Sequence, residues 1–376
     1  MKILLIGEYS NVHWSLAEGL RSLGHKVCVL SNGDFWKNYK RDISLTRSSQ
    51  SKIQGILYLL KLYTLLPRLR GYDVVQLINP MFLEIKAERI APIYKYLKKH
   101  NKKVFLGAFG MDAYWVAACT RTPYTFRYSD FNIGKSPIAN NYTLEQKKDW
   151  QDSAKARLNH KIAEDCNGII AGMYEYHTAY AEQHSNKLAY IPLPIPCDVS
   201  IKRDFYTEER KIRFFIGIQK SRSVYKGTDI MLKALKQIKK NFPDKCEILK
   251  AENIPFEEYT KMIEECDVVL DQLYGYSPGM NALLAMSNGK IVVGGAEEEC
   301  YAILNEKELR PMINVTPSEE DVYNKLKWII DNHHKIAEMQ KESIIYINRH
   351  HNPVKVAEKY IRFWQDKKQT RSMIKK

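Results

Sequence analysis

The sequence lacks the features that would tie it to a disulfide scaffold or a membrane span. Its seven cysteines are scattered over 376 residues, form no Cys-x-x-Cys pair and are odd in number. We therefore expect neither a disulfide framework nor a zinc site, and a reducing compartment fits best. No uncharged stretch approaches the about 20 residues that a membrane-spanning helix needs. The apolar run at the N-terminus is too short for a signal peptide and predicts a first strand.

Acidic residues are outnumbered, with 43 Asp and Glu against 58 Lys and Arg and a net charge of +15 at pH 7. Residues 1–200 hold 27 basic against 17 acidic side chains, so they carry +10 of this excess. Such a surface attracts anionic lipid, nucleic acid or an acidic substrate, and charge alone does not choose among them. Because no basic–aromatic stacking module or recognition motif is present, we expect no nucleic-acid partner.

Apolar runs alternate with helical patterns in the first half of the chain, which predicts an α/β domain over residues 1–195. Leu16, Leu20 and Leu23 have helical spacing after the first run. The loop before them contains Gly7 but lacks the other glycines of the dinucleotide fingerprint, so a hydride-transfer enzyme is disfavoured. The runs that predict strands are residues 2–7, 27–30, 74–78, 104–107, 168–171 and 188–191.

A second α/β series follows residues 192–196, where three prolines predict a linker. This series predicts a second Rossmann-like domain over residues 196–350. A last helix near residues 354–364 and a basic tail form a segment, residues 351–376, that could return to the first domain. The predicted elements of the second domain are strands at residues 212–217, 247–250, 267–273 and 290–295 and a helix at about 229–242.

Residues 274–295 read as an anion-binding unit between two buried strands. Ser277 is a good N-cap, Pro278 suits the first helical position, and Asn288-Gly289 supplies a left-handed stop. We therefore predict a helix from about residue 278 to residue 287.

The start of this predicted helix is a candidate phosphate site. Its first N–H groups, on Gly279, Met280 and Asn281, would point out of the carboxyl end of the sheet, where a phosphate could dock. Gly279 would let a ligand approach the backbone closely. The alternative is a plain crossover helix that packs Met280, Leu283 and Leu284 on the sheet.

A second phosphate-seeking feature leaves the first strand of the second domain. Lys220, Arg222 and Lys226 lie within seven residues of one loop, where they could pair with a diphosphate. A chance cluster on a surface loop is the alternative. This loop opens the same predicted sheet that the residue 278–287 helix joins, so the two features could face one ligand.

Residues 53–70 combine leucines and tyrosines with basic residues and contain no acidic residue. Apolar residues wrap much of the helix that they predict, while Lys61, Arg68 and Arg70 could snorkel. Two interpretations stay open: a core helix of the first domain, or a contact with a membrane surface.

Four motifs together resemble a retaining glycosyltransferase of the GT-B fold, close to family four. In order and spacing they cover most of the chain: residues 16–27, Gly110-Met111-Asp112, Arg222 with Lys226-Gly227, and residues 285–293. The resemblance implies an α/β fold of two Rossmann-like domains that face a cleft. It also implies a nucleotide-diphosphate sugar as donor substrate, held mainly by the second domain, an acceptor held by the first domain, and no cofactor or bound metal.

The resemblance also assigns roles to individual residues. Arg222 and Lys226 match the basic pair that grips the donor diphosphate, with Lys220 as an alternative to Arg222. Asp112 matches an acidic position near the transferred sugar, and a helix cap is the other interpretation of this residue. These matches make Asp112, Arg222 and Lys226 the candidate catalytic residues.

Gly7 and the loop after it match the glycine-rich loop near the acceptor and the phosphates in the family. Because this loop has one glycine, Asn11 and His13 are candidates to contribute instead. For His13 the alternative is a residue at a helix start with a satisfied hydrogen bond.

The chain departs from the family where the family usually places two glutamates, eight positions apart. Tyr276 and Leu284 stand at these positions, and neither accepts a hydrogen bond as a carboxylate does. We predict that Asp271, Tyr276 or the glutamates at residues 297–299 supply the missing contacts, although a solvated loop is the commoner fate of such a triplet. Together with Gly279, Met280 and Asn281, Tyr276 completes the predicted donor-binding set.

These observations predict a glycosyltransferase that moves a sugar to a glycan or lipid-linked acceptor, with retention, in cell-surface polysaccharide synthesis. We expect it in the cytoplasm, peripheral on the cytoplasmic membrane face, with an anionic membrane surface as a further partner of its basic first domain. Two alternatives stay open. One is an inverting GT-B transferase with an unusual donor, and the other is a catalytically inactive binding subunit of a polysaccharide assembly complex.

Overall fold

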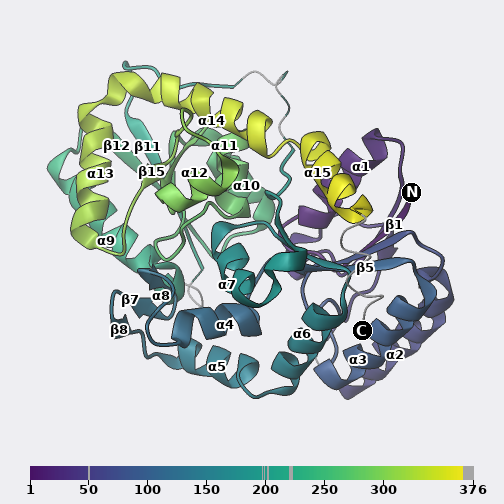
Figure 1. Cartoon of the computed structure of the whole chain (residues 1–376). Helices are drawn as coiled ribbons and strands as arrows, with labels where there is room; N and C mark the ends of the chain where they lie inside the picture. The colour runs from purple at the N-terminus through teal and green to yellow at the C-terminus, as the bar shows by residue number, and fades with distance from the viewer. Residues whose placement is uncertain (50, 197, 199, 201–202, 220–222, 367–376) are drawn as a thin grey trace. The chain divides into compact units, whose positions relative to one another are not determined.

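The computed structural model describes residues 1–49, 51–196, 198, 200, 203–219 and 223–366 (Figure 1). Contacts divide the chain into two compact units. The first unit comprises Met1–Ala118, Leu144–Pro194 and the chain from Pro353 on, and the second comprises Cys119–Thr143 and Ile195–Asn352. The chain thus crosses from the first unit to the second between Pro194 and Ile195, inside the proline-rich stretch at residues 192–196.

The first unit is built on a seven-stranded sheet in the order β10-β9-β5-β4-β1-β2-β3. All its strand pairs are parallel, which agrees with runs that are apolar on both faces. The six strands predicted in this half are present, and β3, of two residues, is the one that the sequence did not predict. The strands are β1 Lys2–Ile6, β2 Lys26–Ser31, β3 Ile43–Ser44, β4 Val74–Leu77, β5 Lys103–Ala108, β9 Gly168–Ala171 and β10 Leu188–Tyr190.

Helices connect or flank these strands. They are α1 Val12–Ser22, η1 Phe35–Lys37, α2 Lys52–Leu65, η2 Leu66–Leu69, α3 Ala87–His100, α6 Ala154–Asp165, α7 Tyr174–His184, η3 Ser185–Lys187 and α15 Pro353–Gln365. Helices α4 (Ala113–Thr120) and α5 (Asn141–Trp150) lie at the two ends of the segment Cys119–Thr143.

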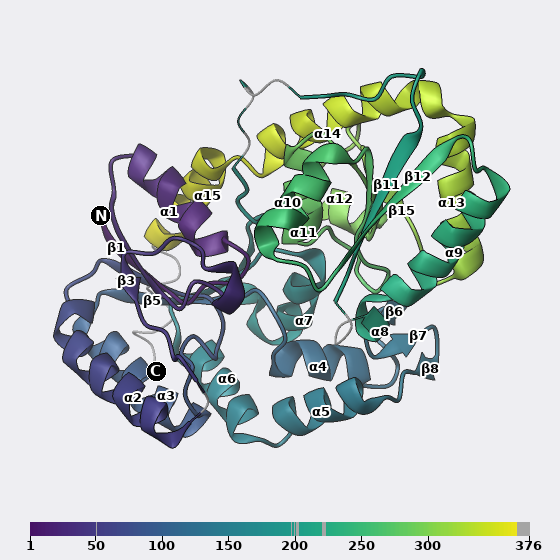
Figure 2. The same ribbon diagram turned by 180° about the vertical axis from the view of Figure 1, so that it is seen from behind.

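The C-terminal helix α15 belongs to the first unit and packs beside α1, as both views show (Figures 1 and 2). A Cβ atom on Gly19 of α1 would come within 2.1 Å of the Pro353 carbonyl oxygen, so glycine is required at this close approach. Tyr360 and Trp364 are buried in the same core as Leu16. The chain from Pro353 therefore completes the hydrophobic core of a domain that begins at Met1.

The second unit contains a five-stranded parallel sheet in the order β12-β11-β13-β14-β15. Its strands are β11 Ile212–Ile218, β12 Cys246–Glu252, β13 Val268–Leu270, β14 Ile291–Gly294 and β15 Ile313–Asn314. Helix α9 packs beside α13, and α11 packs beside α14. Its helices are α8 Ser223–Lys226, α9 Thr228–Asn241, α10 Phe256–Glu265, α11 Met280–Ser287, α12 Glu298–Leu304, α13 Glu319–Asp331, η5 His333–Lys335 and α14 Ile336–His350.

A small antiparallel sheet in Cys119–Thr143 groups with the second unit, whereas the sequence placed these residues in the first domain. Its strands are β6 Tyr128–Ser129, β7 Asn132–Ile133 and β8 Ser136–Pro137. The physical reason lies in Arg127 and Tyr128, which bind Tyr276 and the start of α12 with hydrogen bonds and ring contacts. Sequence patterns could not reveal these contacts because they join residues about 150 or more positions apart.

Candidate functional site

Three loops meet at the carboxyl edge of the second sheet, after β11, β13 and β14. The backbone N–H of Leu273, in the loop after β13, donates to the carbonyl of Lys226 at 2.9 Å. Gly227 has a φ of +69°, and a Cβ there would lie 2.8 Å from Leu273 Cβ. The basic loop after β11 and the loop before α11 are therefore in direct contact, at the edge where parallel α/β sheets bind ligands.

Lys226 is the last residue of α8 and is half-buried beside this edge. The left-handed Gly227 follows it and is the N-cap of α9, which begins at Thr228. Lys220 and Arg222, the other two predicted cations of this loop, lie outside the described residues. Lys226 is thus the cation whose position can be related to the neighbouring loops.

Helix α11 begins at Met280, two residues later than predicted, with Gly279 rather than Ser277 as its N-cap. Gly279 is extended, with φ −80° and ψ 177°, and just before it the Tyr276 carbonyl accepts from the Glu297 N–H at 3.0 Å. The first-turn N–H groups therefore belong to Met280, Asn281 and Ala282. The predicted end of the helix is confirmed, since Gly289 is left-handed with a φ of +70°.

The Asn281 side chain braces the start of α11. Its amide donates to Asp271 Oδ1 at 2.9 Å, and its carbonyl oxygen accepts from the Tyr259 hydroxyl at 2.7 Å. Asp271 is buried at the end of β13. These bonds hold the first turn of α11 in place and leave the backbone groups of Met280 and Asn281 as the candidate ligand donors.

Tyr276, predicted in place of a family carboxylate, is almost completely buried. Its hydroxyl accepts from the Arg127 backbone N–H at 2.7 Å, and the Arg127 guanidinium lies 4.9 Å from its ring centroid. The Tyr128 ring centroid is 5.0 Å away. Burial raises the pKa of Tyr276 to about 12, so the hydroxyl stays protonated at neutral pH.

The glutamates at residues 297–299 do not form a solvated loop. Glu297 and Glu299 both accept from the Arg127 guanidinium, at 2.9 and 3.1 Å, and Glu297 also accepts from the Tyr128 hydroxyl. The hydrogen bond from Arg127 lowers the pKa of Glu299 below its usual value. The two carboxylates thus clamp one arginine of the segment Cys119–Thr143, which the sequence analysis did not single out.

Asp112 follows β5 in the first unit and is fully buried. One carboxylate oxygen accepts from the Trp115 N–H at 2.9 Å, and the other accepts from the Tyr180 hydroxyl at 2.7 Å. Burial raises the pKa of Asp112 to about 6. One oxygen therefore binds the first turn of α4 and the other binds Tyr180 of α7, while a catalytic role for Asp112 stays a prediction.

The loop after β1 contains Gly7, Asn11 and His13. A Cβ on Gly7, whose φ is +87°, would lie 2.2 Å from Ile78 Cγ2, so the loop touches the end of β4. His13 is buried, and its Nδ1 donates to the Gly7 carbonyl at 2.7 Å. Burial lowers the pKa of His13 to about 4, so the ring is neutral, and its buried Nε2 has no hydrogen-bond partner in the described part of the chain.

Glu8 was missed by the sequence analysis. Its two carboxylate oxygens accept from the N–H groups of His13 and Trp14, at 3.1 and 2.9 Å, and so cap the first turn of α1. Burial raises the pKa of Glu8 to about 8. An acidic residue shortly before a helix was the available signal, since a carboxylate is stabilised at a helix N-terminus.

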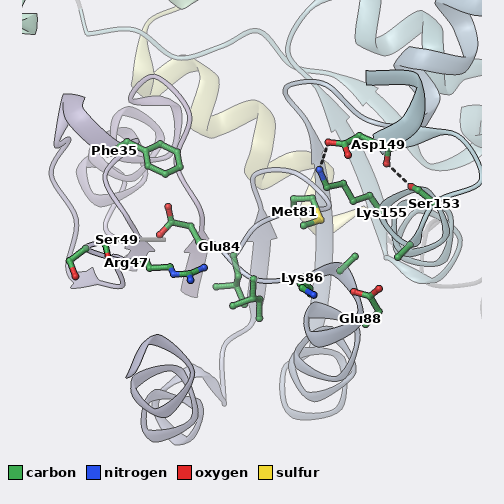
Figure 3. Close-up of a pocket in the computed structure, with 15 residues that line it drawn as sticks. Phe35, Arg47, Ser49, Met81, Glu84, Lys86, Glu88, Asp149, Ser153 and Lys155 are labelled. Atoms are coloured by element: carbon green, nitrogen blue, oxygen red, sulfur yellow. Dashed lines mark hydrogen bonds and ion pairs between the residues drawn. The ribbon is translucent and has the colours of Figure 1, made fainter. Parts of the chain in front are cut away.

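Two cavities in the first unit share Phe35, Met81, Leu83 and Glu84. The larger has a volume of about 880 Å³, and Figure 3 shows Glu84 and Arg47 on one side of it and the bonded pair Lys155 and Asp149 on the other. The smaller, of about 200 Å³, reaches the Gly7 loop. Together they form a concave site that runs along the carboxyl ends of β1 and β4.

The Glu84 side chain, which lines both cavities, has unused hydrogen-bonding capacity. Its Oε1 accepts from the Asn32 side chain at 2.9 Å, whereas its buried Oε2 has no hydrogen-bond partner among the described residues. A buried carboxylate oxygen without a partner is costly, and a ligand hydroxyl could supply the missing bond. No motif in the sequence pointed to this residue.

No cluster of three or more His, Cys, Asp or Glu side chains among the described residues could hold a metal ion. None of the helices in that part of the chain is long and apolar enough to cross a membrane.

No protein-family model and no curated protein matches the sequence. Solved structures match it over nearly its whole length. HepE of Anabaena, in complex with UDP and glucose, has a TM-score of 0.59 and 12% identity, over 96% of this chain and 98% of HepE. Sucrose-phosphate synthase from Thermosynechococcus elongatus has a TM-score of 0.59 and 10% identity, over 97% and 98% of the two chains.

A Listeria monocytogenes protein described as a UDP-N-acetylglucosamine 2-epimerase matches with a TM-score of 0.51 and 10% identity, over 96% of this chain and 95% of that protein. The fold of this chain is therefore the GT-B fold, an α/β architecture of two Rossmann-like units with parallel sheets. Because transferases and an epimerase share it, the reaction has to be argued from the site.

Proposed function

We propose that this chain is a glycosyltransferase that moves a sugar from a nucleotide-diphosphate sugar to a glycan or lipid-linked acceptor of cell-surface polysaccharide synthesis. The observation that carries the proposal is the bond between Leu273 N–H and the Lys226 carbonyl, which joins the basic loop to the loop before α11. The structure of HepE with UDP-glucose, similar over 96% of this chain with a TM-score of 0.57, supports such a donor.

The chemistry of donor cleavage explains these residue types. Departure of the nucleoside diphosphate places negative charge on its terminal phosphate. In the proposed binding mode this phosphate lies beside Lys226 and the first turn of α11. Lys220 and Arg222 belong to the same loop and would add charge. These groups stabilise the transition state more than the ground state, because the charge on the leaving oxygen grows as the bond breaks.

We further propose that transfer retains the configuration of the sugar, with a donor phosphate oxygen as the acceptor of the proton. The buried carboxyl groups of Asp112 and Glu8 support this, since all their oxygens already bind protein hydrogens. Inversion would require a base at the acceptor, for which Glu84 is the candidate. The anomeric coupling constant of the first product, measured by NMR, distinguishes the two outcomes.

A thermal-shift screen against nucleotide sugars tests the proposal, followed by incubation of the stabilising donor with and without acceptor glycans. A donor that binds only the native state adds about 2.7 kcal/mol to the free energy of unfolding when its concentration is 100 times its Kd. Such binding raises the melting temperature. We expect one donor class to do so and to release nucleoside diphosphate. Binding without turnover would favour the inactive subunit, epimerised donor would favour an epimerase, and absence of any shift would contradict a nucleotide-sugar site.

Gly279→Ala tests the predicted close approach of the ligand to the start of α11. A Cβ there would meet no described protein atom nearer than Gln272 Nε2 at 3.9 Å, and the φ of −80° suits alanine. We therefore expect an unchanged melting temperature and a donor Kd raised about tenfold, because the methyl group would occupy the phosphate position. Unchanged donor affinity would place the phosphate elsewhere.

Glu84→Gln tests the acceptor site in the first unit. Loss of a hydrogen bond to a charged group should lower kcat/KM for the acceptor about tenfold or more, while the donor-induced thermal shift stays the same. Glu88→Gln is the matched control, because Glu88 lines the larger cavity but is exposed. Equal kinetics in both variants would contradict a role for Glu84.

A further inference from the structure

Helix α2 presents an apolar stripe to solvent. The five side chains of the stripe are between 50% and 70% exposed: Ile53, Ile56, Leu57, Leu60 and Tyr63. At 3.6 residues per turn they fall within an arc of about 120° on one side of the helix. A contiguous apolar surface of this kind marks an interaction site more often than isolated exposed residues do.

The opposite side of α2 is also apolar. Tyr58, Leu62 and Leu65 are buried there, and the Tyr58 hydroxyl is 3.2 Å from the backbone N–H of Glu84, to which it is hydrogen-bonded. The helix therefore uses one face to pack on the first unit and keeps a second apolar face exposed. Both interpretations of residues 53–70 thus find support on different faces, since a helix that is apolar all round needs a non-aqueous partner on each side.

Basic side chains border the stripe. Lys52 and Lys61 are exposed and, by the same helical geometry, lie just outside its two edges. Arg68 and Arg70 follow in and after η2 and are exposed as well. No acidic residue occurs between Asp42 and Asp73, so the charged side chains of this segment are all basic.

We propose that α2 docks the protein on an anionic lipid bilayer, with the stripe in the acyl boundary and the flanking cations at the lipid phosphates. Long basic side chains can keep their charge at the headgroups while their stems cover apolar surface. A second copy of the chain fits this surface poorly. An isologous pairing would bring the cations of two such helices together, with no acidic residue in the segment to pair with them.

The position of α2 connects this surface to the larger cavity. Arg47 and Ser49 line the cavity (Figure 3). They lie shortly before Lys52, the first residue of the helix. A lipid-linked acceptor held in the bilayer would therefore present its headgroup near the cavity. This consequence rests on the proposed function, whereas bilayer docking itself does not.

Flotation of the full chain with phosphatidylcholine vesicles tests the docking. One set of vesicles contains phosphatidylglycerol as about a third of the lipid, and the other set contains none. We expect binding to the anionic vesicles and at least a tenfold weaker partition for Ile56→Asp combined with Leu60→Asp. Ile345→Asp on α14 is the matched control, because Ile345 is an isoleucine outside the stripe that is 50% exposed, against 57% for Ile56. Lys52→Gln with Lys61→Gln should weaken anionic binding about tenfold or more and leave neutral vesicles unaffected.

The substituted side chains are exposed, so the melting temperatures of the variants should stay unchanged. A change in vesicle binding can therefore be attributed to the stripe or to the cations rather than to unfolding. Failure of the wild type to bind anionic vesicles, or equal binding by the stripe variant, would overturn the proposal. So would a lipid-free dimer that dissociates in the stripe variant, which would identify a second copy as the occupant. The assay contains no nucleotide sugar, so Lys226→Ala should bind vesicles normally even if the transferase proposal fails.

Discussion

Replacing Lys226 by alanine should lower kcat by about a hundredfold or more, because it removes one of the charges proposed to stabilise the leaving diphosphate. The fold should persist, since Lys226 ends a four-residue helix at the sheet edge and its backbone carbonyl, not its side chain, binds Leu273. Steady-state kinetics and thermal unfolding of the same preparation measure the two effects.

Lys236→Ala provides the control for this variant. Lys236 is exposed on α9, ten residues further along the chain, and carries the same charge. Its loss should leave kcat within about twofold of the wild type. Combination of Lys226→Ala with Arg222→Ala should remove most of the activity, and near-normal turnover in that double variant would contradict the donor site proposed for this loop.

Gly295→Ala should destabilise the second unit by about 1–3 kcal/mol and weaken donor binding at the same time. A Cβ at Gly295 would lie 2.2 Å from the Gly275 carbonyl oxygen and 2.6 Å from its carbon. Because both are backbone atoms, the loop that leads to α11 has to move. The expected result is a melting temperature several degrees lower and a smaller donor-induced shift.

The comparison with Gly279→Ala separates the two roles that glycine plays here. Gly279 has free space for a methyl group in the protein, so its substitution should affect the ligand alone. Gly295 has none, so its substitution should affect the fold first and the ligand through it. A stable Gly295→Ala protein with normal donor affinity would show that the loop position is not critical.

The strands of both large sheets could be predicted because parallel strands are buried on both faces and leave uninterrupted apolar runs in the sequence. The runs at residues 168–171 and 212–217, for example, match β9 and β11 closely. The two-residue strands β6, β7 and β8 could not be predicted, because two residues are too few to show an alternation of apolar and polar side chains. Their positions depend on Arg127 and Tyr128, whose partners are far away in sequence.

The sequence predicted those parts of the site whose conformation depends on neighbouring residues. It did not predict the parts whose conformation depends on contacts between residues far apart in the chain. The left-handed Gly289 ends α11 as its sequence indicates. The Ser277-Pro278 start was wrong because Gly279 is extended, and the Tyr276 carbonyl before it binds the distant Glu297 N–H. Glu84 carries no local signal at all, since its interest comes from the cavities around it and from an oxygen without a partner.

The return of α15 to α1 also affects the order in which the protein can fold during synthesis. The core of the first unit contains Ile3 and Leu5 from the start of the chain and Trp364 from near its end. A ribosome must therefore synthesise the chain through Trp364 before this core can close. The second unit, whose Ile195–Asn352 portion emerges earlier, has its sheet available first, so the N-terminal unit should be the last to become resistant to proteolysis.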